Sequence, residues 1–443
     1  MVSVLAPNGP LHAVSANPVC CGTFAVIGAW SFGCWVSLVS RLRLRGGTRP
    51  AQSTMIGFLA TIVVLCLGYW TVDTPTPALP VIRDDLGLTA TVTGMVFSFF
   101  FFGRLVANVP AAWVVDQRGP KVTICIGALL VMLGSLVSAI SPSAVPLLAA
   151  RTVQGMGVAF LATAGLLSLL RVRPAGGAAM ASFNVAAGVG GAIGLLIGGL
   201  LTGAFGWRSV FFQSAAIAAV ILLIGVFAPQ HNAQSRPSPS DEDADGTSAV
   251  AAPKMRINGL LVLAMAANFL VFLNYCIWAV GAPLYVAEVV GATPEVLGQL
   301  LLVITIVHLL GAFPMGRLVR LIGPYPVFGM GMVLTAVGVF TAIFMQSAWG
   351  MVLPLALYAA GASAANIASG DLLLRLGGAG GKAVGMVRLT SDFGMVLGPI
   401  FAGILADRFG VRAPFVAVGS LSVVAAIAVA IVLLVVRRRL ARI

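Results

Sequence analysis

Residues 55–72 read "MIGFLATIVVLCLGYWTV", a stretch without any charged side chain. A helix rises about 1.5 Å per residue, so this stretch and its neighbours are long enough to cross the ~30 Å hydrocarbon core of a bilayer. The rest of the chain has the same character, because 59% of its 443 residues are hydrophobic and only 9% are charged. A soluble domain cannot bury so much apolar surface, so the sequence predicts an all-α membrane protein.

Similar apolar stretches recur along the chain, separated by short loops that contain glycine, proline or charged residues. They predict twelve spans in two sets of six, at 55–80, 91–114, 121–140, 145–170, 177–203 and 208–228, and at 257–282, 296–316, 325–344, 349–372, 383–405 and 414–436. We therefore expect one six-helix bundle over 55–228 and a second over 257–436, followed by a basic cytoplasmic tail at 437–443.

The two predicted bundles are related by an internal repeat. A shift of 204 residues aligns many residues without gaps, among them Gly87 with Gly291, Gly94 with Gly298, Gly119 with Gly323, and Gly206 with Gly410. Residues 229–256, rich in Ser, Pro and Asp, predict a flexible cytoplasmic linker. Two pseudo-symmetric bundles joined by a loose linker suit rocking of one bundle against the other around a central site.

An extension precedes the first bundle. Within residues 1–54, positions 20–39 form one more apolar stretch without a preceding Lys or Arg, which is unlike a signal peptide. This stretch is either a thirteenth span or part of an upstream extension, if translation begins near Met55.

The charge distribution indicates orientation rather than a partner. The formal charge is +13, and most of the 26 Lys and Arg residues fall on the side of the loop around residue 118. This is the positive-inside asymmetry, so we expect a multi-pass cell-membrane protein with its linker and C-terminus in the cytoplasm. We expect no nucleic-acid partner. The six Cys and three His show no metal-ligand spacing, which predicts neither a metal site, a cofactor nor an enzyme.

The loop "AAWVVDQRGPK" (111–121) resembles the signature loop of the major facilitator superfamily, with Asp116, Gly119 and Lys121 matching. The equivalent loop of the second half, "GRLVRLIGP" (316–324), keeps glycines and carries a base in place of the acid; its residues of interest are Gly316, Arg320 and Gly323. The resemblance implies a transporter fold and a gating role for both loops. The alternative for Asp116 is a loop carboxylate that only ends a helix.

Three further stretches carry the resemblance. "RTVQGMG" (151–157) resembles the superfamily's fourth-helix motif, and "GGAIGLLIGG" (190–199) the fifth-helix motif of its antiporter branch, although Leu195 stands where proline is usual. Asp73, with Pro-Ala-Leu-Pro starting four residues later, resembles the first helix of drug:proton antiporters of the bicyclomycin-resistance type. Small residues at four-residue spacing let helices approach closely. We expect helix packing at Gln154, Gly155, Gly190, Gly194, Gly198 and Gly199.

Ionisable residues inside spans are rare, and they usually face one another or a water-filled space. Six such residues are present: Asp73, Arg104, Arg151, His308, Arg388 and Asp392. Counting along each helix places Asp73 and Arg151 in the outer third of the membrane and Arg104, His308 and Asp392 near its midplane. The spacing of Arg388 and Asp392 also allows a local pair within one helix.

Asp73 and Arg151 are the candidate proton-coupling residues. Burial favours the neutral form of a carboxyl group, whereas a nearby arginine favours the ionised form, so a pair of this kind can switch with small changes in geometry. The resemblance implies the same assignment. The prolines after Asp73 predict a break in the helix there. The alternative is that Asp73 only marks the outer end of its helix and touches water or headgroups.

The sequence predicts a monomeric, proton-coupled antiporter that exports small, partly apolar or cationic molecules. Arg104 or Asp392 would anchor the substrate, and helix position suggests Trp70, Phe101, Asn108, Asn274, Tyr275 and Trp278 for the walls of its site. The alternative function is uptake or exchange of a small anion, such as nitrate, cyanate or a carboxylate, by Arg104 and His308 facing each other. Against it stands the interpretation that Arg104 neutralises Asp392 and that His308 is a polar packing residue.

Overall fold

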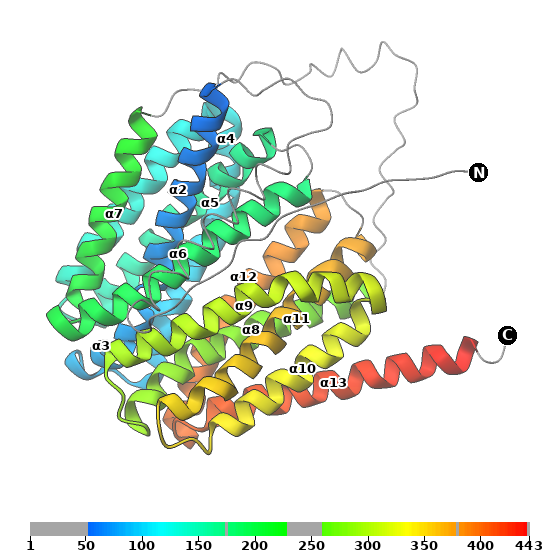
Figure 1. The fold of residues 1–443 in the computed structure, drawn as a ribbon. Helices are drawn as coiled ribbons and strands as arrows, with labels where there is room; N and C mark the ends of the chain where they lie inside the picture. Colours follow the sequence, from blue (N-terminus) through cyan, green and yellow to red (C-terminus); the bar gives the residue numbers. More distant parts are fainter. Residues whose placement is uncertain (1–51, 173–175, 228–258, 378–380, 441–443) are drawn as a thin grey trace, which may run out of the picture. The chain divides into compact units, whose positions relative to one another are not determined.

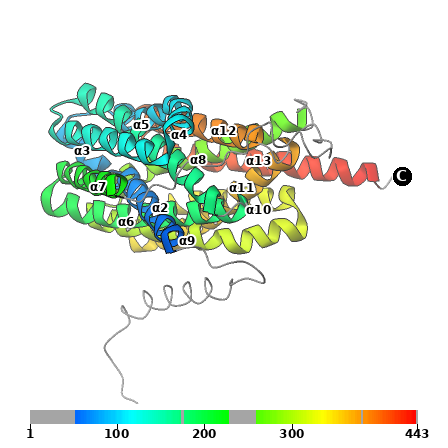
Figure 2. The same ribbon diagram turned by 90° about the horizontal axis from the view of Figure 1, so that it is seen from above.

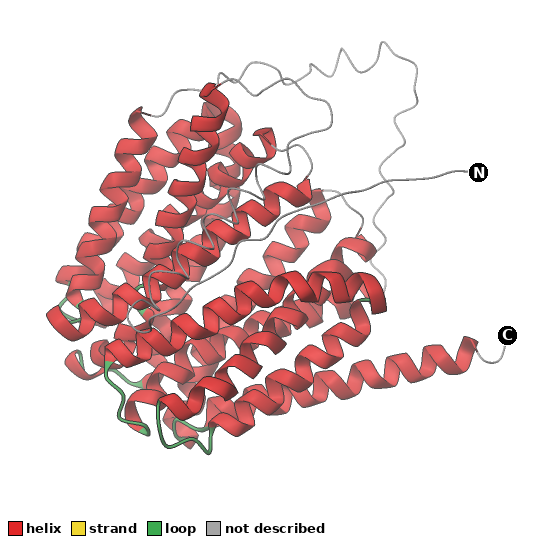
Figure 3. Cartoon of the chain, in the orientation of Figure 1, coloured by secondary structure: helices red, strands yellow, loops and turns green. Residues whose placement is uncertain are grey.

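Helices make up the described fold. The computed structural model describes residues 52–172, 176–227, 259–377 and 381–440, and within them no strand occurs (Figure 3). Backbone N–H and C=O groups find no water in lipid, and a helix satisfies them within one segment. The predicted all-α fold is confirmed. The apolar stretch 20–39, the linker 229–256 and the last residues of the tail lie outside the described residues.

The first half of the chain supplies the helices coloured blue to green in Figure 1. They are α2 (Gln52–Asp73), the short 3-10 helix η1 (Thr76–Ala78), α3 (Leu79–Asp85), α4 (Ala90–Ile140), α5 (Ala144–Val172), α6 (Gly176–Phe205) and α7 (Arg208–Phe227). Helix α4 holds two predicted spans in its 51 residues and bends between them at Gly119, where φ is 78° and ψ is 170°. Among the described residues 11 helices are long and apolar enough to cross a membrane. Helix α4 is counted once among them but holds two spans, which gives the predicted twelve.

The second half forms the other bundle. Its helices are α8 (Gly259–Glu288), α9 (Pro294–Ile322), α10 (Pro324–Ala342), the 3-10 helix η2 (Trp349–Met351), α11 (Val352–Gly377), α12 (Gly381–Phe409) and α13 (Ala413–Leu440). The two bundles meet where α4 packs against α12 and α6 packs against α9, and Figure 2 shows both pairs side by side.

The predicted break after Asp73 is present. Helix α2 ends at Asp73, and η1 and α3 continue the chain with prolines at their first turns. Proline has no N–H to donate and clashes with the preceding turn. The Thr74 hydroxyl and N–H both donate to the Trp70 carbonyl, at 2.6 and 3.2 Å, which closes the last turn of α2. Asp73 therefore sits at a helix end, not in a continuous helix.

The internal repeat is visible in the backbone. Six glycines of the described residues have a positive φ, and they form three pairs 204 residues apart: Gly87 and Gly291, Gly119 and Gly323, Gly206 and Gly410. Residues with a Cβ rarely adopt this conformation, so glycine is required at these turns. The two halves thus turn in the same way at equivalent positions.

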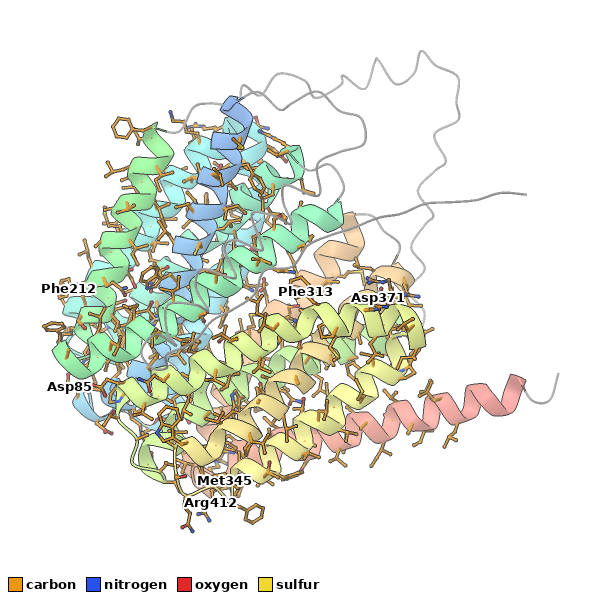
Figure 4. The ribbon with its side chains drawn as sticks, viewed as in Figure 1. Asp85, Phe212, Phe313, Met345, Asp371 and Arg412 are labelled. Carbon is orange, nitrogen blue, oxygen red and sulfur yellow. The ribbon has the colours of Figure 1, made fainter. Side chains whose placement is uncertain are left out.

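The turns define two ends of the bundles. We call the end with the loops 86–89, 141–143, 206–207, 289–293, 343–348 and 410–412 the α3 end, and the opposite end, with Gly119 and Gly323, the Gly119 end. Figure 4 labels Asp85 and Arg412 at the α3 end and Asp371 at the Gly119 end.

Candidate functional site

A row of glycines on α6 positions the end of α2. Gly190, Gly194 and Gly198 face the carbonyl oxygens of Cys66, Trp70 and Thr74, so a side chain at any of these glycines would collide with the α2 backbone. Both sets of residues have four-residue spacing, which keeps the two helices in register over more than two turns. The result is a close contact that fixes Asp73 against α6.

Two other glycines of the motifs also face backbone. Gly155 of α5 faces the Phe100 carbonyl of α4, inside the first bundle. Gly199 of α6 faces the Pro294 carbonyl of α9, which belongs to the second bundle. One face of the fifth-helix motif therefore packs within the first bundle, and the other packs against the second bundle.

Asp73 is partly exposed as a residue, and its carboxyl group lies beside α6. One of its oxygens lies against Gly191 of α6, and none of the ion pairs found among the described residues includes it. Tyr275 of α8, in the other bundle, interacts electrostatically with Asp73 and remains 38% exposed. Residues of both bundles thus contribute to the surroundings of Asp73.

Arg151 is completely buried in the first bundle. Its Nη1 donates to Oε1 of Gln154 at 2.5 Å, and its Nε donates to the Val96 carbonyl at 3.2 Å. The guanidinium carbon lies 4.5 Å from the centre of the Phe100 ring and 5.9 Å from that of Phe211, which are favourable cation–π distances.

A direct Asp73–Arg151 ion pair is absent from the described residues. Arg151 interacts with Asp73 only electrostatically at longer range, because Gln154 and the aromatic rings hold the guanidinium. Its Nη2 is buried and has no hydrogen-bond partner. The coupling role of the two residues stays a prediction, but the expected contact between them is not formed in this conformation.

A second buried charge cluster joins the bundles. Arg104 of α4 forms an ion pair with Asp392 of α12, and the Asn108 amide donates to the other Asp392 oxygen at 2.8 Å. The side chains of Arg104 and Asp392 are 15% and 3% exposed. The interpretation that Arg104 neutralises Asp392 agrees with this geometry. The suggested local pair of Arg388 with Asp392 is not found, because Arg104 and Asn108 occupy both carboxylate oxygens.

His308 and Arg104 have different interaction partners. It forms a hydrogen bond with the backbone of Ala359 of α11, inside the second bundle. The interactions found for the two residues thus join Arg104 to Asp392 and His308 to Ala359, and the anion site stays an alternative prediction.

The residues suggested for the walls have different surroundings. Trp70 is half-buried and its indole N–H has no partner, whereas Phe101 is buried with the Arg104 guanidinium 5.1 Å from its ring centre. Asn274 is buried and donates to Ser422 of α13 in its own bundle, and its amide oxygen has no partner among the described residues. Trp278 is buried and stacks on Tyr358, with ring centres 4.4 Å apart.

Sequence reasoning missed two tyrosines. Tyr69 interacts electrostatically with Asp73, Arg104, Arg388 and Asp392, which places it among the charges of both bundles. It precedes Asp73 by one helical turn, a spacing that could have identified it. Tyr358 carries a buried hydroxyl without a partner, and no pattern in the sequence indicated it.

The gating loops lie at the Gly119 end. Asp116 and Arg320 are exposed, and neither these two residues nor Lys121 takes part in an ion pair found among the described residues. Gly316 has open space where a side chain would be. The described residues hold no group of three or more His, Cys, Asp or Glu suited to a metal ion.

Comparisons with known proteins agree with the helical architecture. The model of the Major Facilitator Superfamily matches residues 58–274 and 263–442. Multidrug resistance protein MdtG of Salmonella paratyphi C (strain RKS4594) is 26% identical over 353 residues, which cover 76% of this chain and 86% of that protein.

Solved structures share the fold. A bacterial homologue of the human lysosomal transporter Spinster, in an inward-facing and unoccupied conformation, has a TM-score of 0.72 at 14% identity and covers 86% of this chain and 97% of that one. The nucleoside transporter NupG has a TM-score of 0.65 at 14% identity, covering 85% and 98%.

Proposed function

Because the chain belongs to the Major Facilitator Superfamily, and is therefore a multi-pass membrane transporter and not an enzyme, we propose that it is a proton-coupled antiporter that exports small, partly apolar or cationic molecules. The observation that carries the proposal is the Asp73 carboxyl group, which lies between the bundles without an ion-pair partner among the described residues.

The surroundings of Asp73 suit a group that exchanges a proton for a substrate. Asp73 is partly exposed and forms no ion pair with another described residue, so a cation that approaches its carboxyl group would favour the ionised form. A substrate cation near Asp73 favours the same ionised form, so protonation of Asp73 and binding of the cation oppose each other. This antagonism is what antiport requires.

The rings near Asp73 support an apolar or cationic substrate. Tyr275 offers an exposed aromatic face, and Trp70 offers an indole N–H that has no partner. Aromatic faces attract organic cations, and free donors hydrogen-bond to polar atoms of a ligand. The relative named a multidrug resistance protein is consistent with this class of cargo.

We place the Gly119 end in the cytoplasm of a cell-membrane protein, and we expect a monomer. Arg118, Lys121 and Arg320 lie at the Gly119 end, and positive charge favours the cytoplasmic side. A membrane potential of 100 mV supplies about 2.3 kcal/mol per charge moved, whereas a complete swing of a two-state equilibrium takes ~5.5 kcal/mol. Proton transfer and substrate binding must therefore contribute to the cycle.

Transport in proteoliposomes tests the proposal. With an imposed pH gradient, the wild type should move a cationic dye against inward proton flow, and Asp73→Asn should abolish that coupled flux because the amide cannot carry a proton. Asp371→Asn is the matched control, since Asp371 pairs within its own helix with Arg375 at 2.5 Å. Coupled dye flux that survives in Asp73→Asn, or flux of nitrate that is lost in Arg104→Ala, would contradict the proposal.

A further inference from the structure

The two bundles touch along two lines of contact near the α3 end. In the first, between α4 and α12, Gly94 faces the Pro399 carbonyl and Gly403 faces the Ala90 carbonyl. The added side chain of any other residue would collide with backbone at both glycines. We call this line the α4/α12 seam.

The second line, which we call the α6/α9 seam, repeats the first. Here Gly298 faces the Leu195 carbonyl and Gly199 faces the Pro294 carbonyl. Each of these positions is 204 residues from its counterpart: Gly94 and Gly298, Gly403 and Gly199, Pro399 and Leu195, Ala90 and Pro294. The pseudo-symmetry of the molecule therefore extends to the contact between its halves, and the α3 end is closed on both sides.

The seams differ in their polar contacts. In the α4/α12 seam the Asp407 carboxylate reaches the first turn of α4 in the other bundle. Its Oδ1 accepts from the Ala90 N–H at 2.8 Å, and its Oδ2 accepts from the Thr91 N–H at 2.8 Å and from the Thr91 hydroxyl at 2.6 Å. The first N–H groups of a helix have no partner within it, and the positive end of the helix dipole favours an anion.

The α6/α9 seam has no equivalent carboxylate. Gly203 occupies the position that corresponds to Asp407, 204 residues earlier. The first turn of α9 instead has its own acid, because Glu295 hydrogen-bonds to Thr293 and to its own backbone while its side chain lies over Gly203. Separating the bundles would leave these local bonds of Glu295 intact, whereas it would break the bonds that Asp407 accepts from Ala90 and Thr91 and its hydrogen bond with the Thr89 side chain.

We propose that Asp407 is a one-sided latch: a carboxylate of the second bundle that caps a helix of the first and holds the α3 end closed. Opening of this end requires the N–H groups of Ala90 and Thr91 to exchange Asp407 for water. The α6/α9 seam has no hydrogen bonds equivalent to those of Asp407, so α6 and α9 separate without the free-energy cost of breaking them. The proposal concerns conformation alone and does not depend on the substrate or on proton coupling.

Distances between spin labels at the α3 end test the latch. Pro142→Cys in the first bundle and Gln346→Cys in the second give exposed label sites, in a chain whose six native cysteines are replaced. Loss of a helix cap typically costs ~1–2 kcal/mol, which changes an equilibrium constant about five- to thirtyfold. In purified, lipid-reconstituted protein, Asp407→Ala should therefore raise the ratio of long to short distances about five- to thirtyfold.

Three variants make the outcome decisive. Thr91→Val removes only the hydroxyl donor and should give a smaller shift, and Asp371→Ala, at the Gly119 end, should give none. Gly403→Leu forces the seam apart and shows that the labels report opening. If Gly403→Leu lengthens the distances and Asp407→Ala leaves the wild-type distribution unchanged, the latch does not exist.

Discussion

Arg104 and Asp392 hold opposite charges in different bundles, and both are largely removed from solvent. A buried ion pair adds little net stability, but removing one partner leaves an uncompensated charge and typically costs 3–5 kcal/mol. We predict that Asp392→Leu lowers the free energy of unfolding by about this amount, and that Arg104→Leu does the same, measured by thermal unfolding in detergent.

The double variant Arg104→Leu/Asp392→Leu separates this effect from general damage to packing. With both charges gone, no unpaired group remains, so its stability should recover to within ~1–2 kcal/mol of the wild type. Losses that simply add in the double variant would contradict the pairing.

For single residues, the sequence located the ionisable side chains, and it anticipated one of their pairings, that of Arg104 with Asp392. The depth of Asp73, Arg104 and Asp392 followed from counting residues along predicted helices. Arg151 bonds to Gln154 and not to Asp73 because of its side-chain rotamer and the aromatic rings of neighbouring helices. The order of residues along the chain does not reveal these contacts. His308 and Ala359 come together for the same reason.

At the scale of the helices, the close approach of α4 and α5 depends on residues without side chains. Gly155 faces the Phe100 backbone, which cannot move without displacing α4. We predict that Gly155→Val destabilises the protein by at least ~1–3 kcal/mol through overpacking, whereas Gly370→Val, which has open space beside it in α11, has a much smaller effect. Detergent-solubilised yield and thermal unfolding check both variants, and equal losses would refute the explanation.

The helices themselves were predictable because their apolar stretches are long and their ends carry glycine, proline or charge. The bend in α4 was anticipated as a loop, yet the chain stays helical on both sides of Gly119, and one glycine with positive φ suffices for the change of direction. The sequence also predicted that the fifth-helix motif packs closely. It did not show that Gly190, Gly194 and Gly198 meet α2 while Gly199 meets α9, since the partner helix depends on tertiary arrangement.

At the scale of the whole molecule, the repeat predicted two similar halves, and six glycines with positive φ at a spacing of 204 residues bear it out. The repeat did not reveal which end of the bundles is closed, because both conformations of a rocking carrier use the same sequence. The glycines of the two seams become meaningful only once α4 lies on α12 and α6 lies on α9.

The equivalence of the seams leads to a prediction about closure. Gly199→Leu and Gly403→Leu each place a bulky side chain against the backbone of the opposite bundle, so each should hold the α3 end open and slow transport at least tenfold in proteoliposomes. Gly370→Leu, which touches neither seam, serves as the control. Wild-type rates in both seam variants would mean that the α3 end need not close during the cycle.

The α3 end carries a further exposed link between the bundles, the ion pair of Arg83 and Glu288, whose side chains are 26% and 42% exposed. Dissolved electrolyte weakens attraction between surface charges, with a Debye length of about 8 Å at physiological ionic strength. The glycine contacts are uncharged and do not respond in this way. The salinity of the medium bathing that one face should therefore bias how long the carrier dwells in each orientation, without any change in the molecule it carries.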